Sequence, residues 1–136
     1  MLECLILGDS LAVGVGQIRK ECTTQAVSGI NSYAYVNRHL FYTNGNDTAK
    51  TVIISLGSND LRNVNTFEEL KTLRELVKAD RVYWILPNIK DSKRANVQQV
   101  ADLYKDFVID ARKYDVSPDG VHPTYKGYKD IAKDTK

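Results

Sequence analysis

The sequence predicts one α/β domain, built on a five-stranded parallel sheet with helices on both faces. Short apolar segments alternate with segments of helical periodicity along the whole chain, which is the element order of a parallel sheet covered by helices. Residues 51–56 are all apolar or β-branched except Ser55, as expected of a central strand buried on both faces. At 136 residues the chain is long enough for a single well-buried core, so residues 1–136 are expected to form one domain.

The first half of the chain is expected to hold three strands and two helices. An apolar strand over residues 2–7 leads into a helix from Ser10 to about residue 20, and residues 21–27 form the second strand. Asn31 or Ser32 can cap the next helix, whose apolar side chains have helical spacing: Tyr33, Val36, Leu40 and Phe41. The turn cluster 44–47 ends this helix before the strand 51–56.

The second half continues the alternation. Thr66 begins a capping box and a helix with one apolar stripe, made of Phe67, Leu70, Leu73, Leu76 and Val77. A strand over 81–86 and a helix from about residue 93 follow. Residues 107–110 fit either a fifth strand or the tail of that helix, and the strand is favoured. Thr124 caps a last helix with four inward side chains: Tyr125, Tyr128, Ile131 and Ala132.

The composition narrows the classes of function and partner. The net charge of +2 comes without a basic cluster, so no nucleic-acid partner is expected. No apolar run approaches the roughly 20 residues that span a bilayer, so no membrane partner is expected either. Polar residues interrupt the first apolar segment, which predicts synthesis in the cytoplasm without a signal peptide. A monomer is expected.

Two cysteines, Cys4 and Cys22, are too few for a disulfide framework or a cysteine metal site. Both lie in expected strands, where we predict two buried thiols that pack as small hydrophobic side chains. A bridge between them requires that the two strands be neighbours with suitable geometry.

Ser10 lies at the turn between the first strand and the first helix. The carboxyl ends of parallel strands share one edge of the sheet, and open α/β sheets bind ligands there. Backbone N–H groups at the helix start point into the same space, where they can stabilise negative charge. The alternative is that Asp9 and Ser10 are simply an N-cap pair.

A serine nucleophile needs a base in hydrogen-bond reach and a third group that orients the base. His122 lies in a loop three residues after Asp119, so a tight turn at Gly120 can bring the carboxylate to the imidazole Nδ1. Nε2 is then left to face Ser10. The alternative is an ordinary turn before a helix. The second histidine, His39, falls inside an expected helix and is interpreted as exposed and without function.

An acyl-transfer site also needs hydrogen-bond donors for the oxyanion. The backbone N–H groups of Ser10 and Gly29 and the side-chain amide of Asn59 are the candidates, since each follows a different strand. The alternative for Asn59 is a helix-cap or turn residue.

Four short blocks together resemble the SGNH hydrolases, also called the GDSL esterase and lipase family. They are Gly8-Asp9-Ser10-Leu11, then Gly29, then Gly57-Ser58-Asn59-Asp60, and last Asp119-Gly120-Val121-His122-Pro123. The resemblance implies a three-layer flavodoxin-like fold and hydrolysis through an acyl-enzyme, with no metal or organic cofactor. It implies Ser10 as nucleophile, His122 as general base and acid, and Asp119 as its partner. Ser10, Gly29 and Asn59 would form the oxyanion hole.

The short loops of this chain favour a small acyl group, such as acetyl, on a polar carrier. Tyr33 and Tyr35 are candidates to stack on sugar rings, and Asn31, Arg62, Asn63 and Asn88 are candidates to hydrogen-bond the carrier. Carbohydrate deacetylation is therefore the favoured function. Two alternatives remain open at this point: a hydrolase of peptidoglycan or capsule, including one from a phage, and a non-catalytic module that binds glycan or protein.

Overall fold

The computed structural model describes residues 2–39, 48–90 and 92–136. Its five strands form one parallel sheet in the order β2-β1-β3-β4-β5. The strands are β1 (Leu2–Gly8), β2 (Thr23–Ala26), β3 (Thr48–Ser55), β4 (Lys78–Leu86) and β5 (Phe107–Asp110). The predicted fold class is thus confirmed, including the strand at 107–110. The largest differences from the predicted bounds are that β2 is shorter at both ends and that β3 and β4 each begin three residues earlier.

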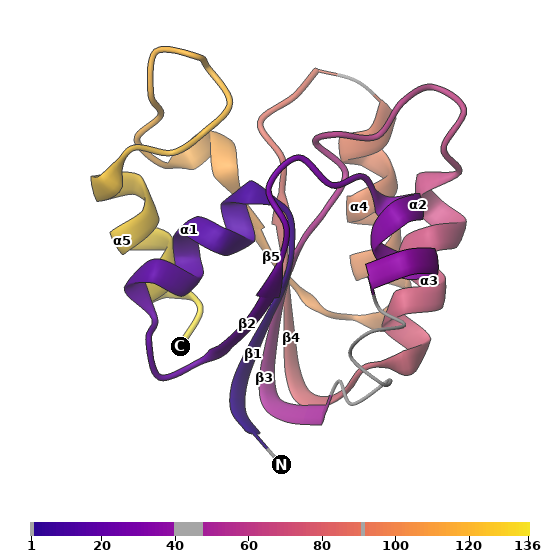
Figure 1. The fold of residues 1–136 in the computed structure, drawn as a ribbon, viewed down its shortest axis with the longest axis horizontal. Coiled ribbons are helices and arrows are strands. Elements are labelled where there is room, and N and C mark those ends of the chain that lie inside the picture. The colour runs from indigo at the N-terminus through magenta and orange to yellow at the C-terminus, as the bar shows by residue number, and fades with distance from the viewer. Residues whose placement is uncertain (1, 40–47, 91) are drawn as a thin grey trace.

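The helices cover the sheet in two layers (Figure 1). On one face lie α1 (Ser10–Ile18) and α5 (Tyr125–Asp134). The other face carries α2 (Ser32–Ala34) with the π-helix η1 (Tyr35–His39), α3 (Thr66–Leu76) and α4 (Ser92–Tyr104). Strand side chains alternate between the two layers: Leu5, Val52 and Trp84 pack toward α3 and α4, whereas Ile6, Ile53 and Ile85 pack toward α1 and α5. The loops that follow the strands gather at one edge of the sheet, the upper edge in Figure 1.

The helix expected after Asn31 has a different inward face. Of the two residues predicted as its N-cap, Asn31 is the one that caps it. The Asn31 side chain accepts the Ala34 N–H at 2.7 Å. Ser32 is fully buried, so Tyr35, three residues on, shares its face and is fully buried too. Tyr33 points away and is 49% exposed. Of the other residues predicted here, Leu40, Phe41 and the turn 44–47 lie outside the described residues.

The predicted cap of α3 is wrong, whereas the predicted cap of α5 is confirmed. The N-cap of α3 is Asn65 and not Thr66, because the Asn65 side chain accepts the Glu68 N–H while the Thr66 hydroxyl is engaged by a loop carboxylate. Thr124 caps α5 as predicted. Tyr125, however, is 72% exposed and not inward, and its ring lies under the Lys129 ammonium at 5.5 Å. Leu76, at the last turn of α3, is likewise partly exposed.

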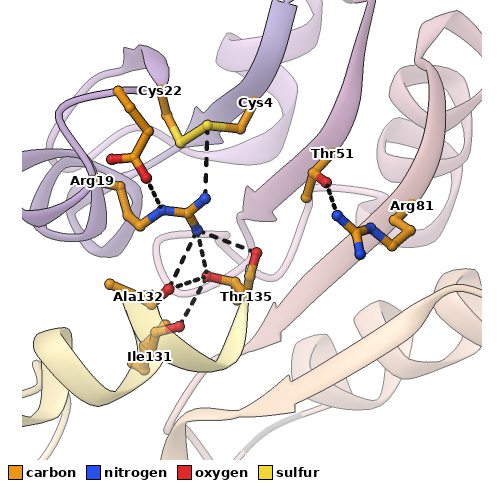
Figure 2. The surroundings of a disulfide bond; sticks show 9 residues. Cys4, Arg19, Cys22, Thr51, Arg81, Ile131, Ala132 and Thr135 are labelled. Atoms are coloured by element: carbon orange, nitrogen blue, oxygen red, sulfur yellow. Dashed lines mark hydrogen bonds and ion pairs between the residues drawn. A yellow bond between two sulfur atoms is a disulfide. The ribbon is translucent and has the colours of Figure 1, made fainter.

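Cys4 and Cys22 form a disulfide, so the prediction of two thiols is wrong (Figure 2). The register of β1 and β2 explains the pairing. Leu5 lies opposite Thr23, which brings the residues just before them to a Cα–Cα distance of 4.7 Å. The bridge closes a loop that contains the whole of α1.

A buried arginine lies next to this bridge. Arg19 is the C-cap of α1 and is 6% exposed. Its guanidinium donates to the carbonyl oxygens of Ala132 and Thr135, at 3.3 and 3.2 Å, and to the carboxylate of Glu21 at 2.9 Å (Figure 2). The carbonyls belong to the end of α5, where a cation also favours the helix dipole. Arg19 therefore joins the far ends of α1 and α5.

Candidate active site

The turn between β1 and α1 is fixed by contacts to the end of β3. Gly8 has a φ of +136°, and a Cβ there would lie 1.9 Å from the Ser55 carbonyl oxygen, so only glycine fits. The Asp9 N–H donates to that same oxygen at 2.9 Å. Ser10 is then the first residue of α1 and is partly exposed at the carboxyl edge of the sheet.

Asp9 is the N-cap of α1, as the alternative interpretation of the turn predicted. Its Oδ1 accepts the Leu11 N–H at 3.1 Å and the Ser55 hydroxyl at 2.9 Å. The side chain is fully buried, and burial raises its pKa to about 6, although these hydrogen bonds lower it in part. Because Asp9 does the capping, the Ser10 side chain remains for a different contact.

The Ser10 side chain begins a row of three hydrogen-bonded side chains. Ser10 Oγ lies 2.9 Å from His122 Nε2, across 112 residues of sequence, and His122 Nδ1 lies 2.6 Å from Asp119 Oδ2. An ionised carboxylate can only accept, so Nδ1 donates to Asp119. In the neutral ring Nε2 then accepts the Ser10 hydroxyl proton. This is the geometry that an activated serine requires.

The Asp119 carboxylate is held by its own loop. Its Oδ1 accepts the backbone N–H groups of Val121 and His122, at 2.8 and 2.9 Å, and the Ser117 hydroxyl at 3.1 Å. These backbone hydrogen bonds, together with the contact to the His122 ring, hold the Asp119 pKa well below its ordinary value. The Ser117 N–H in turn donates to the His122 carbonyl at 2.8 Å and closes the loop. Asp119 is therefore ionised and fixed in place.

The candidate oxyanion donors follow three neighbouring strands of the sheet. Ser10 follows β1, Gly29 follows β2 and Asn59 follows β3. Gly29 has a φ of +80°, and the space that a side chain would fill is open. One N–H of the Asn59 amide donates to the Ile30 carbonyl at 3.1 Å, which leaves the second N–H of the same nitrogen for a substrate.

Four of the six predicted carrier contacts line one of two hollows, each of which includes residues of the loop after Asn59. Asn31 and Tyr33 line a hollow of 430 Å³ together with Leu61, Asn63, Val64, Asn65 and Glu69. Arg62 lines another of 340 Å³ with Asp60, Ser92 and Lys93. Asn88 is half-buried in the loop after β4. Tyr35 is fully buried, and its hydroxyl donates to the Gln25 carbonyl at 2.7 Å, so it offers no surface for stacking.

His39 is half-buried, in contrast to the predicted exposed imidazole. Its ring lies 4.9 Å from that of Tyr35, in the helix layer opposite α1. Within the described residues no cluster of three His, Cys, Asp or Glu side chains could hold a metal ion. Nor does any helix among them have the length and apolar character that crossing a membrane requires.

Sequence reasoning did not predict the contacts of three polar residues around the site: Ser55, Asp60, which it named only as part of the block 57–60, and Asp9 as a buried titratable group. Ser55 anchors the Ser10 turn, and Asp60 binds two groups outside its own loop. The only signal for Asp60 was its place next to Asn59.

Solved structures share this architecture, although neither a protein-family model nor a curated protein matches the sequence. A carbohydrate acetylesterase from Sinorhizobium meliloti matches with a TM-score of 0.65 and 14% identity, over 98% of both chains. A member of the lipolytic G-D-S-L family from Veillonella parvula matches with a TM-score of 0.62 and 19% identity, over 98% of this chain and 95% of the other. The chain has the SGNH hydrolase fold.

The same fold forms part of a larger protein as well. Protein YxiM from Bacillus subtilis matches with a TM-score of 0.69 and 15% identity, over 99% of this chain. This chain spans 55% of that protein, so the SGNH fold seen here corresponds to little more than half of its length.

Proposed function

We propose that this protein is a serine esterase that removes a small acyl group, acetyl above all, from a carbohydrate or another polar carrier. The observation that carries the proposal is the hydrogen-bonded row from Ser10 through His122 to Asp119. Two further facts support it. The row lies at the carboxyl edge of the sheet, beside candidate donors for an oxyanion, and the fold is shared with esterases and acylhydrolases.

In the proposed reaction Ser10 Oγ attacks the ester carbonyl carbon, and its proton passes to His122 Nε2. The carbonyl oxygen becomes an oxyanion, which the Ser10 and Gly29 N–H groups and the Asn59 amide stabilise. The carbon–oxygen bond to the carrier then breaks, and His122 returns the proton to the leaving alcohol. A water molecule, deprotonated by His122, attacks the acyl-enzyme and releases the acid and Ser10. Asp119 keeps Nδ1 protonated and stabilises the imidazolium.

The proposed carrier would bind along the loop after Asn59, where the hollow with Asn31 and Tyr33 offers amide groups and an exposed aromatic ring. Arg62 and Asn88, on the loops after β3 and β4, are the further proposed contacts. The structural likeness to a carbohydrate acetylesterase supports this choice of carrier.

The test is hydrolysis of p-nitrophenyl acetate by the wild type and by Ser10→Ala, followed by acetate release from a panel of acetylated glycans. We expect turnover by the wild type and a loss of several orders of magnitude in the variant, because the members of such a triad act as a unit. A wild type that binds glycans without turning over any ester would contradict the proposal and favour a binding module.

A further inference from the structure

The loops that carry Gly29 and Asn59 are tied together by one carboxylate, that of Asp60. Its Oδ1 accepts the backbone N–H of Ser32 at 2.6 Å, and its Oδ2 accepts the Thr66 hydroxyl at 2.6 Å. Ser32 and Thr66 are 0% and 1% exposed. Asp60 therefore connects the start of α2, the start of α3 and its own loop after β3.

Gly29 lies in a turn that the Ile30 N–H closes on the Val27 carbonyl at 3.3 Å, and the Val27 N–H ties this turn to the Gly8 carbonyl at 2.9 Å. The space where a Gly29 side chain would lie is open, with no atom within 4 Å. The chain is next fixed at Ile30, whose carbonyl accepts the Asn59 amide, and at Ser32, whose N–H donates to Asp60. Asn59 and Asp60 therefore hold the segment 30–32 in place, through the Ile30 carbonyl and the Ser32 N–H.

We propose that Asp60 is a positioning residue, which sets the place of the Gly29 N–H relative to the Asn59 amide. The inference rests on the proposed function, in which both groups stabilise the oxyanion. Donors of this kind act only when their geometry is fixed before charge develops, since a displaced donor contributes little to the transition state. Loss of the Asp60 carboxylate should then lower kcat and leave KM nearly unchanged.

The decisive variant is Asp60→Ala, compared with Asp60→Asn. Alanine removes both acceptors, whereas asparagine keeps Oδ1 for the Ser32 N–H and can donate to the Thr66 oxygen through Nδ2. We expect kcat for p-nitrophenyl acetate to fall about tenfold or more in Asp60→Ala, with KM within about threefold of the wild type. Asp60→Asn should recover most of the loss.

Asp106→Asn is the matched control for a purely structural effect. The Asp106 side chain is 5% exposed and accepts from Arg74 and from Trp84 Nε1, but Asp106 precedes β5 at the opposite edge of the sheet. This variant should lose thermal stability while its kcat stays within about twofold of the wild type.

Amide hydrogen exchange supplies a readout that needs no substrate. Exchange across residues 29–34 should be faster in Asp60→Ala than in the wild type and unchanged in Asp106→Asn. If the wild type fails to hydrolyse any ester, the proposed function fails and the exchange result alone decides whether Asp60 holds this segment. If the wild type is active, an Asp60→Ala variant with wild-type kcat or wild-type exchange overturns the inference. Should Asp60→Ala not fold, the smaller changes expected in Asp60→Asn decide by the same two measurements.

Discussion

Two aspartates near Ser10 have opposite electrostatic environments. Asp9 is fully buried beside the turn, and burial raises its pKa to about 6. Asp119 is exposed, and backbone N–H groups lower its pKa below the ordinary value. The difference separates their roles, because Asp119 stays ionised as a partner for His122 while Asp9 is a structural cap whose charge destabilises the fold.

At the scale of single residues, the raised pKa of Asp9 predicts how the stability of the fold depends on pH. The folded-state pKa of Asp9 lies above the ordinary value of 3.8, so the folded protein holds this proton more tightly than the unfolded chain. The stabilisation from this group is therefore complete below about pH 4 and is lost as the pH rises through about 6. The pKa difference corresponds to about 3 kcal/mol at pH 8.

Asp9→Asn, which resembles the neutral acid, isolates this effect. Urea unfolding of the variant and the wild type should give similar stabilities near pH 4 and a more stable variant near pH 8. The difference between the two profiles matters, since the lowered pKa values of Asp110 and Asp119 contribute to both proteins alike. If the unfolding free energies of the two proteins run parallel from pH 4 to 8, ionisation of Asp9 does not destabilise the fold, which contradicts this prediction.

The second prediction separates the two roles of Asn59. Loss of its hydrogen bond to Ile30 alone should cost about 1 kcal/mol of stability and little activity. As an oxyanion donor, its interaction strengthens as charge develops, so Asn59→Ala should lower kcat by about 100- to 1000-fold. Steady-state kinetics should show KM within a few-fold of the wild type. An Asn59→Ala variant with near-normal kcat would remove this amide from the site.

At the scale of elements, α1 and α5 are joined at both ends. The Ser10–His122 contact connects the start of α1 with the loop that precedes α5. At their far ends Arg19 binds the last carbonyls of α5 and lies 3.8 Å from Cys4 Sγ (Figure 2). The disulfide ties this end of α1 to β1. The helix that carries Ser10 is therefore anchored to α5 at both ends, and to the sheet through Asp9 and Ser55 at its start and through the disulfide at its far end.

Reduction of the disulfide is the test at this scale. The bridge spans a sequence separation of 18 residues, and closing a loop of this size stabilises a fold by about 3 kcal/mol. We expect dithiothreitol to lower the melting temperature of the wild type. Cys4→Ser/Cys22→Ser should melt at the lower temperature with or without reductant. Alkylation of free thiols in the unreduced native protein would contradict the bridge itself.

At the scale of the whole molecule, topology was the most predictable feature. Alternating periodicities specify a parallel sheet, and a parallel sheet brings the loops after its strands to one edge. That argument predicted the approach of Ser10 to His122, which the structure shows at 2.9 Å, although their catalytic roles stay predictions. Turn and cap chemistry specified the start of α5 at Thr124 equally well.

Features that depend on register or on side-chain rotation could not be predicted from the sequence. The disulfide follows from the pairing of Leu5 with Thr23, which periodicity does not specify. Tyr35 instead of Tyr33 is buried because the helix begins at Ser32, one residue after the cap. The carboxylate of Asp60 could not be assigned either, because its partners belong to two other elements.

The central claim is that Ser10 is a nucleophile activated by His122, and covalent labelling tests it most directly. A fluorophosphonate probe reacts with an activated serine, and peptide mass mapping locates the adduct. We predict one adduct, on Ser10, in the wild type, and labelling slowed by several orders of magnitude in His122→Ala, because the hydroxyl then has no base. An adduct on any other residue, or equally fast labelling of Ser10 without His122, would contradict the account.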